Sequence, residues 1–114
     1  MLIDIGEKVH IIERRLFESD VRRHFVGVVE RVDAATMRVR GYVFTHDSSS
    51  SQYVRSQDQR IRIFPLISSG FIVNVVAPST EIDDVRYVIT ETGRLVVTDG
   101  AGFSLDINEF GRMR

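Results

Sequence analysis

The sequence has no cysteine, only two prolines among its 114 residues, and no long uninterrupted apolar run. Without cysteine, the chain offers no disulfide framework, no zinc-thiolate site and no thiol nucleophile. This composition fits a reducing compartment, so we expect a cytoplasmic protein. The longest apolar stretches are only as long as a strand, which predicts no membrane span, and the N-terminus shows no signal-peptide pattern.

An excess of charge of either sign is also missing, because the formal net charge is -1, with 15 Lys and Arg against 16 Asp and Glu. A dominant phosphate-binding surface is therefore not expected. The chain is 43% hydrophobic and 27% charged, which is typical of a soluble globular protein. Its length suits one domain with a substantial core.

Short apolar segments alternate with turn-like segments along the whole chain. β-Branched residues and period-two alternation predict strands at residues 8–14, 25–32, 37–45, 61–67 and 71–77. Gly27 predicts a bend or bulge in the second of these, since glycine otherwise weakens a strand interior. Pro65 lacks an N-H group and favours an edge position for the fourth.

The polar segment 46–59 contains four consecutive serines and is predicted to be a loop inserted between two strands. The final third offers a hairpin plus one further strand, with Phe103, Leu105 and Ile107 facing inward. The expected fold class is all-β. Residues 1–78 are predicted to form a small, strongly bent, SH3-like barrel, and residues 79–114 a C-terminal β-hairpin extension packed on the same domain.

Two stretches, in this order, are similar to the two sequence motifs of the Sm-like (LSm) family. The first follows the family outline through Phe25, Gly27, Val29, Val32, Asp33 and Met37. The second follows it through Ile67, Gly70, Ile72, Val73, Val75 and Pro78. The resemblance spans about residues 8–78. It implies a five-stranded, strongly bent barrel that closes into a ring with further copies and commonly binds single-stranded RNA.

The resemblance implies RNA-binding positions at Asp33, Thr36, Met37, Arg38, Ser69 and Gly70. Three of these depart from the family pattern, because Thr36, Arg38 and Ser69 replace a base-stacking residue, an asparagine and an arginine. Threonine has no aromatic face and serine has no planar charged fork, so the base pocket is reduced. Two positions also have structural interpretations, in which Asp33 closes a turn and Met37 fills a core.

A second candidate surface is a basic patch of four arginines: Arg14, Arg15, Arg22 and Arg23. In the alternative interpretation, these arginines pair with interleaved acids on a solvated loop: Glu13, Glu18 and Asp20. The three histidines show no metal-ligand spacing, and no catalytic motif is present. We therefore expect no enzymatic activity, no cofactor and no metal site.

These observations predict a non-enzymatic Sm-like module that forms a homo-oligomeric ring by pairing strand 61–67 of one copy with strand 71–77 of the next. Such a ring is expected to bind single-stranded RNA weakly. The alternative is a structural or protein-interaction barrel that has lost the nucleic-acid pocket and docks a protein partner through residues 79–114. A third interpretation is an SH3-like barrel that does not form rings.

Overall fold

The structure is a computed structural model that describes residues 2–68 and 70–107. Its regular elements are nearly all strands, so the predicted all-β class is confirmed. They are β1 (Lys8–Glu13), β2 (Arg23–Val32), β3 (Thr36–Asp47), β4 (Gln52–Arg55), β5 (Arg60–Pro65), β6 (Phe71–Val75), the short 3-10 helix η1 (Ile82–Asp84), β7 (Arg86–Ile89), β8 (Leu95–Thr98) and β9 (Ser104–Asp106). Among the described residues, no helix is long and apolar enough to cross a membrane.

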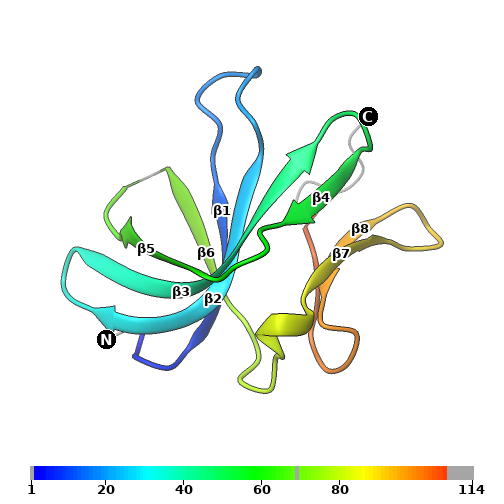
Figure 1. Cartoon of the computed structure of the whole chain (residues 1–114). Coiled ribbons are helices and arrows are strands. Elements are labelled where there is room, and N and C mark those ends of the chain that lie inside the picture. Colours follow the sequence, from blue (N-terminus) through cyan, green and yellow to red (C-terminus); the bar gives the residue numbers. More distant parts are fainter. Residues whose placement is uncertain (1, 69, 108–114) are drawn as a thin grey trace.

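The first six strands form one antiparallel sheet in the order β4-β3-β2-β1-β6, with β5 also paired to β3. Two strands pair with the same edge of the long strand β3: β5 pairs with residues 36–41 and β4 with residues 44–47. Figure 1 shows β4 and β5 on opposite sides of the point where the strands cross. In the described part of the chain, no pairing joins β5 to β6, so the bent sheet is not closed into a barrel.

The bend of this sheet depends on two glycines that face each other, Gly27 on β2 and Gly41 on β3. A Cβ atom on Gly41 would overlap the backbone carbonyl of Val26, and one on Gly27 would overlap that of Arg40. Only glycine allows the two backbones to approach so closely. The register irregularity lies further along, between Val29 and Arg31, so Gly27 serves the close crossing and the bulge falls elsewhere.

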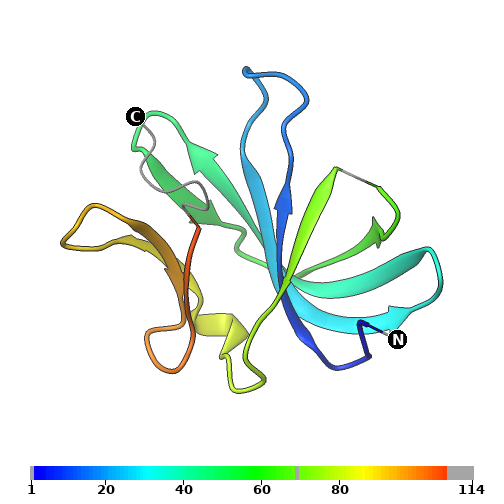
Figure 2. The same cartoon turned by 180° about the vertical axis from the view of Figure 1, so that it is seen from behind.

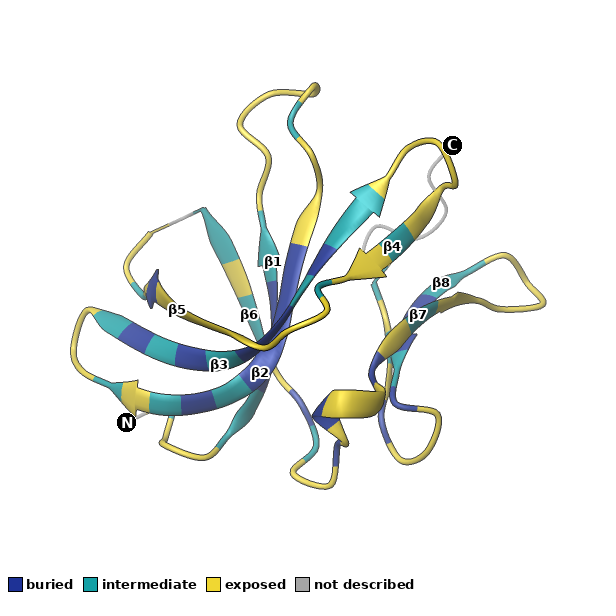
Figure 3. Cartoon of the chain, viewed as in Figure 1, coloured by how far each residue is buried: buried dark blue, intermediate teal, exposed yellow. Residues whose placement is uncertain are grey.

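Both faces of the central strands are buried, and each face carries its own hydrophobic cluster (Figure 3). Successive side chains of a strand point to opposite faces, so neighbours such as Phe25 and Val26 belong to different clusters. The first cluster lies inside the bend: Val9, Ile11, Phe25, Val29, Met37, Val39 and Phe64. The second lies against the C-terminal strands: Val26, Tyr42, Phe44, Val76, Ile82, Val85, Val97 and Phe103.

The C-terminal strands form a separate three-stranded antiparallel sheet in the order β7-β8-β9. Figure 2 shows this sheet beside the β3-β4 hairpin, away from the free edges of β5 and β6. Phe103 is buried, and Leu105 and Ile107 pack against the same cluster, which confirms their predicted inward orientation. The turn before β9 is held by Asp99, whose carboxylate accepts hydrogen bonds from the N-H groups of Glu81, Ala101 and Phe103.

The prediction that residues 46–59 form a loop is wrong in part. Strand β3 continues to Asp47, and β4 then returns along it, with Asp47 opposite Gln52. The reversal occurs at the serines, because the Asp47 carboxylate accepts hydrogen bonds from the backbone and hydroxyl of Ser49, and Ser51 takes a positive φ of 58°. The serine-rich composition therefore marks a tight turn inside a hairpin.

Candidate functional site

The turn that the resemblance associates with RNA is closed by Asp33. One carboxylate oxygen of Asp33 accepts hydrogen bonds from the N-H of Ala35 at 2.9 Å, from the N-H of Thr36 at 2.8 Å and from the Thr36 hydroxyl at 3.1 Å. These bonds hold the pKa of Asp33 below its usual value, the bond from Ala35 contributing most. The structural interpretation of Asp33 as a turn residue is therefore confirmed.

Met37 and Arg38, which follow this turn, have different environments. Met37 is only 1% exposed and belongs to the cluster inside the bend, so its side chain fills the core. Arg38 lies on the opposite face, where its Nε is 3.3 Å from Glu30 Oε1. A shallow cavity of about 160 Å³ lies beside it, lined by Arg31, Val32, Asp33, Thr36, Arg38 and Ile63. Of the implied positions that the structure describes, only Asp33, Thr36 and Arg38 line this cavity.

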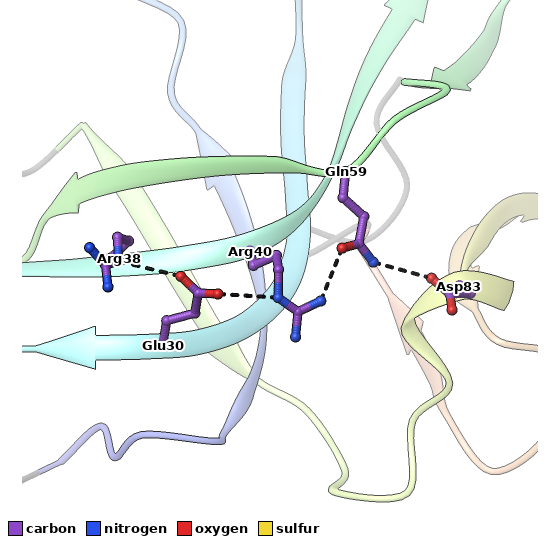
Figure 4. A network of polar contacts seen from close by, with 5 residues as sticks. All are labelled: Glu30, Arg38, Arg40, Gln59 and Asp83. Atoms are coloured by element: carbon purple, nitrogen blue, oxygen red, sulfur yellow. Dashed lines mark hydrogen bonds and ion pairs between the residues drawn. The ribbon is translucent and has the colours of Figure 1, made fainter.

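The same Glu30 carboxylate also binds Arg40, and a chain of polar contacts continues from there (Figure 4). Arg40 Nη1 donates to Gln59 Oε1 at 3.0 Å, and Gln59 Nε2 donates to Asp83 Oδ1 at 3.5 Å. This series of polar contacts connects the outer face of the bent sheet to η1. Because these groups lie at the surface, the contacts orient Arg38 and Arg40 more than they stabilise the fold.

The loop after β5 begins beside the turn at residues 33–36, since the N-H of Leu66 donates to the carbonyl of Ala35 at 2.7 Å. Its far end lies elsewhere. The carbonyl of Gly70 accepts from the N-H of Arg14 at 2.8 Å, which places Gly70 at the end of β1. Ser69, the remaining predicted position, lies outside the described residues.

The predicted basic patch is divided between two places. Arg14, Arg15 and Arg22 line one cavity of about 270 Å³ together with Ile12, Glu13, His24, Ile72 and Ile107. Arg23 instead lines a different groove. The expected pairing with Glu18 and Asp20 is wrong for the described residues: the Asp20 carboxylate accepts from the N-H groups of Leu16 and Phe17, and Arg15 donates to the Glu18 carbonyl.

An arginine-rich groove of about 340 Å³, here called the arginine groove, was not predicted from the sequence. It is lined by Arg23, Val43, Thr45, Val54, Arg55, Ser56, Arg60 and Arg62. Its arginines come from β2, β4 and β5, so their proximity depends on the strand order. The only sequence signal was the alternation of arginine with isoleucine in the segment 60–63.

The structure also brings together histidines that the sequence separates. His10 and His24 are 0% and 7% exposed, and both contact the hydroxyl of Tyr87, at 3.0 Å from His10 Nε2 and 2.5 Å from His24 Nδ1. Asn74 Nδ2 lies 3.2 Å from His10 Nδ1. Burial lowers the pKa of His10 to about 4. Burial, with smaller effects from His10 and Arg22, lowers the pKa of His24 to about 3.

These histidines hold the two sheets together. Tyr87 belongs to β7, whereas His10 and His24 belong to β1 and β2, so the tyrosine hydroxyl joins the C-terminal sheet to the bent sheet. The ring of Tyr53 stacks on that of Tyr87 with centroids 4.3 Å apart. Among residues 2–68 and 70–107, no three His, Asp or Glu side chains are grouped so that they would hold a metal ion.

Comparisons with known proteins identify no relative from which these surfaces can be interpreted. A scan against protein-family models, a search of curated proteins and a search of solved structures each find no match.

Proposed function

We propose that this chain is a non-enzymatic module that assembles into a homo-oligomeric ring through the free edges of β5 and β6. The observation that carries the proposal is that both edge strands expose large apolar side chains. On β5, Ile61 and Ile63 are 60% and 67% exposed. On β6, Ile72 and Val75 are 36% and 54% exposed.

Edge strands of this kind are prone to pair with another chain, because their outer N-H and C=O groups have no partner strand. Within the described residues, β5 pairs only with β3 and β6 only with β1. The proline on β5, Pro65, stands at the last position of the strand and protects little of the edge. Pairing one edge with the other is a head-to-tail contact, which produces a ring when the rotation closes. The resemblance of residues 8–78 to Sm-like proteins supports the same assembly.

Weak binding of single-stranded RNA is the second part of the proposal, and it concerns the cavity beside Arg38. The cavity has two further exposed or partly exposed polar side chains, Arg31 and Thr36, that can contact a phosphate. Base recognition has little support there, because no aromatic side chain of residues 2–68 and 70–107 lines the cavity.

The alternative function is a protein-interaction module without a nucleic-acid pocket. It is favoured by the burial of Met37 and by the use of the Asp33 carboxylate within its own turn. Both positions are then retained for folding alone, and the exposed edges serve assembly or a protein partner.

The deciding experiment is the molar mass of the purified chain, measured by size-exclusion chromatography with light scattering at micromolar concentration. We expect an oligomer for the wild type and a monomer for Ile61→Lys/Ile63→Lys, because lysines on an edge oppose strand pairing. The matched control is Leu2→Lys/Ile5→Lys, which changes two exposed apolar residues away from both edges, 98% and 67% exposed. A monomeric wild type contradicts the proposal, and so does an edge variant that remains oligomeric.

A further inference from the structure

The arginine groove exists because the edge of β3 is left uncovered between its two partner strands. Pairing with β5 ends at Gly41 opposite Arg60, and pairing with β4 begins at Phe44 opposite Arg55. Ser56 fixes the chain across this gap, since its N-H donates to the Val43 carbonyl at 2.8 Å and its hydroxyl accepts from the Val43 N-H at 3.1 Å. The floor of the groove is therefore held in place by the backbone.

The side chains around this floor are basic on three sides. On β5, Phe64 points into the core cluster, so Arg60 and Arg62, four and two residues earlier, point to the same concave face. Arg23 stands opposite Thr45 on the neighbouring pair of strands. Arg55 also lines the groove, but its guanidinium lies on the other face of the sheet, where its central carbon is 4.4 Å from the centre of the Tyr42 ring. Among the described residues, no Asp or Glu lines the groove itself. Glu13 stands opposite Arg23 on β1 and lines the adjoining cavity with Arg23 and Arg62.

The charges of the groove are largely uncompensated. In the part of the chain that the structure describes, the side chains of Arg23, Arg60 and Arg62 make no hydrogen bond and no ion pair within the chain. Arg55 donates only to a neutral group, the carbonyl of Asp83, at 2.7 Å. Elsewhere on the same sheet, Arg38 and Arg40 share the carboxylate of Glu30. A cluster of like charges repels itself, and a bound anion relieves that repulsion.

We propose that the arginine groove binds a compact oligophosphate, that is, a ligand with two or more linked phosphoryl groups. Guanidinium groups donate paired hydrogen bonds that match phosphate oxygens. One phosphate monoester carries about -1.5 to -2 charges at neutral pH, so more than one phosphoryl group is needed to balance the three guanidinium groups of Arg23, Arg60 and Arg62. The volume of about 340 Å³ is in the range of small-ligand sites.

The shape and lining of the groove favour this ligand over a strand of nucleic acid. Single strands are generally held by aromatic side chains that stack on the bases, and none of the described residues that line the groove is aromatic. Its apolar members, Val43 and Val54, belong to β3 and β4 and offer no planar surface. The groove is also independent of the proposed ring, because Arg60 and Arg62 lie on the face of β5 opposite to the exposed Ile61 and Ile63.

The test is isothermal titration calorimetry of the full chain with inorganic triphosphate, ATP, inorganic monophosphate and a short oligouridylate, all at low ionic strength. The groove variant is Arg60→Gln/Arg62→Gln. The matched control is Arg86→Gln/Arg94→Gln, which removes the same charge from arginines outside both the groove and the cavity beside Arg38. Circular dichroism and the melting temperature without ligand establish that both variants are folded.

We expect triphosphate to bind the wild type at least about tenfold more tightly than monophosphate, because each charge-assisted contact adds to the affinity. The groove variant is expected to lose at least about tenfold in affinity for triphosphate, and the control less than about twofold. Similar affinity for ATP and free triphosphate indicates that the phosphate chain alone is recognised, whereas tighter ATP binding points to a nucleotide as the source of that chain.

Three results would overturn the proposal. One is the absence of triphosphate binding at low ionic strength, and another is an equal loss of affinity in the groove and control variants. The third is tighter binding of the oligouridylate than of triphosphate, with that binding lost in Arg60→Gln/Arg62→Gln, because the groove would then be a nucleic-acid site.

Discussion

Acidification is expected to separate the two sheets, because their junction requires neutral histidines. The Asn74 amide nitrogen can only donate, so His10 Nδ1 must accept, and neutral His10 carries its proton on Nε2. His10 Nε2 then donates to the Tyr87 oxygen, and the Tyr87 hydroxyl donates to His24 Nδ1. A proton added to either ring places a donor against a donor and a cation in a buried site.

The magnitude follows from the lowered pKa values of the two histidines. Both pKa values start from 6.5 in the unfolded chain and fall to about 4 for His10 and about 3 for His24 in the folded chain. Between these limits the unfolded state binds more protons, so stability is retained above pH 6.5 and lost as the pH falls toward 4. From pH 7 to pH 5 each histidine costs about 2 kcal/mol, and the pair about 3–4 kcal/mol. This loss is a large part of the stability of a typical domain.

Three hydrogen-bonded aspartates affect stability only at lower pH, so they do not obscure the effect of the histidines. Hydrogen bonds hold the pKa values of Asp33, Asp47 and Asp99 below 3.8, so their contribution to stability is lost only in more acidic solution. The interval between pH 6.5 and pH 4 therefore reports on the histidines.

The assay is urea unfolding followed by circular dichroism at pH 7, 6 and 5, at one protein concentration so that any assembly contributes equally. A histidine NMR titration of the folded chain supplies an independent measurement. His24→Leu is expected to remove about half of the pH dependence, because it removes one of the two titrating groups. The reasoning is refuted if stability changes by less than about 1 kcal/mol between pH 7 and 5, or if both buried histidines titrate near 6.5.

Three further predictions concern Gly41 where β2 and β3 cross, Phe103 in the core, and Arg38 in the cavity that the Sm-like resemblance associates with RNA. Gly41→Ala is expected to lower the free energy of unfolding, measured in urea, by at least about 3 kcal/mol, because the added Cβ overlaps a backbone carbonyl. In the control Gly93→Ala the added Cβ contacts no atom, so only the positive φ of 82° opposes the substitution. Phe103→Ala is expected to cost about 3–5 kcal/mol, and a loss below about 1 kcal/mol would show that the C-terminal sheet is not packed there. Arg38→Ala is expected to weaken oligouridylate binding more than Thr36→Ala does in a fluorescence anisotropy titration, with affinity falling steeply as salt rises; equal effects would contradict a phosphate contact by Arg38.

Local patterns were sufficient to predict most of the strands, and β4, inside the segment expected to be a loop, was missed. Alternation and β-branched residues identified the segments of β1, β2, β3, β5 and β6, and the observed ends differ from the predicted ends by a few residues. Pro65 was expected on an edge strand and lies on β5, which pairs only with β3 in the described chain. These features depend on residues close in sequence, for which backbone and side-chain preferences are informative.

The candidate surfaces were harder to predict because they depend on which strands become neighbours. The arginine groove needs Arg23 and Arg62, which are far apart in sequence, to face the same concavity. His10 and His24 become neighbours because β1 pairs with β2 in a register that places Ile12 opposite His24, and Tyr87 then joins them from β7. A single sequence carries no direct signal for such register.

The alternation of β3 nevertheless contained a signal that the chain has two layers. Arg38 and Arg40 share one parity with Tyr42 and Phe44, so the same face of the strand changes from charged to aromatic at Gly41. A strand face that becomes aromatic over four residues requires a cover from that point onward, because exposed aromatic side chains favour association. The C-terminal sheet supplies this cover, with Phe103 and Val97 packed in the same cluster as Tyr42 and Phe44. The first half of β3 has no such cover, and there Glu30 neutralises the arginines at the surface. Gly41 thus separates the part of the sheet that faces solvent from the part that forms a two-layer core.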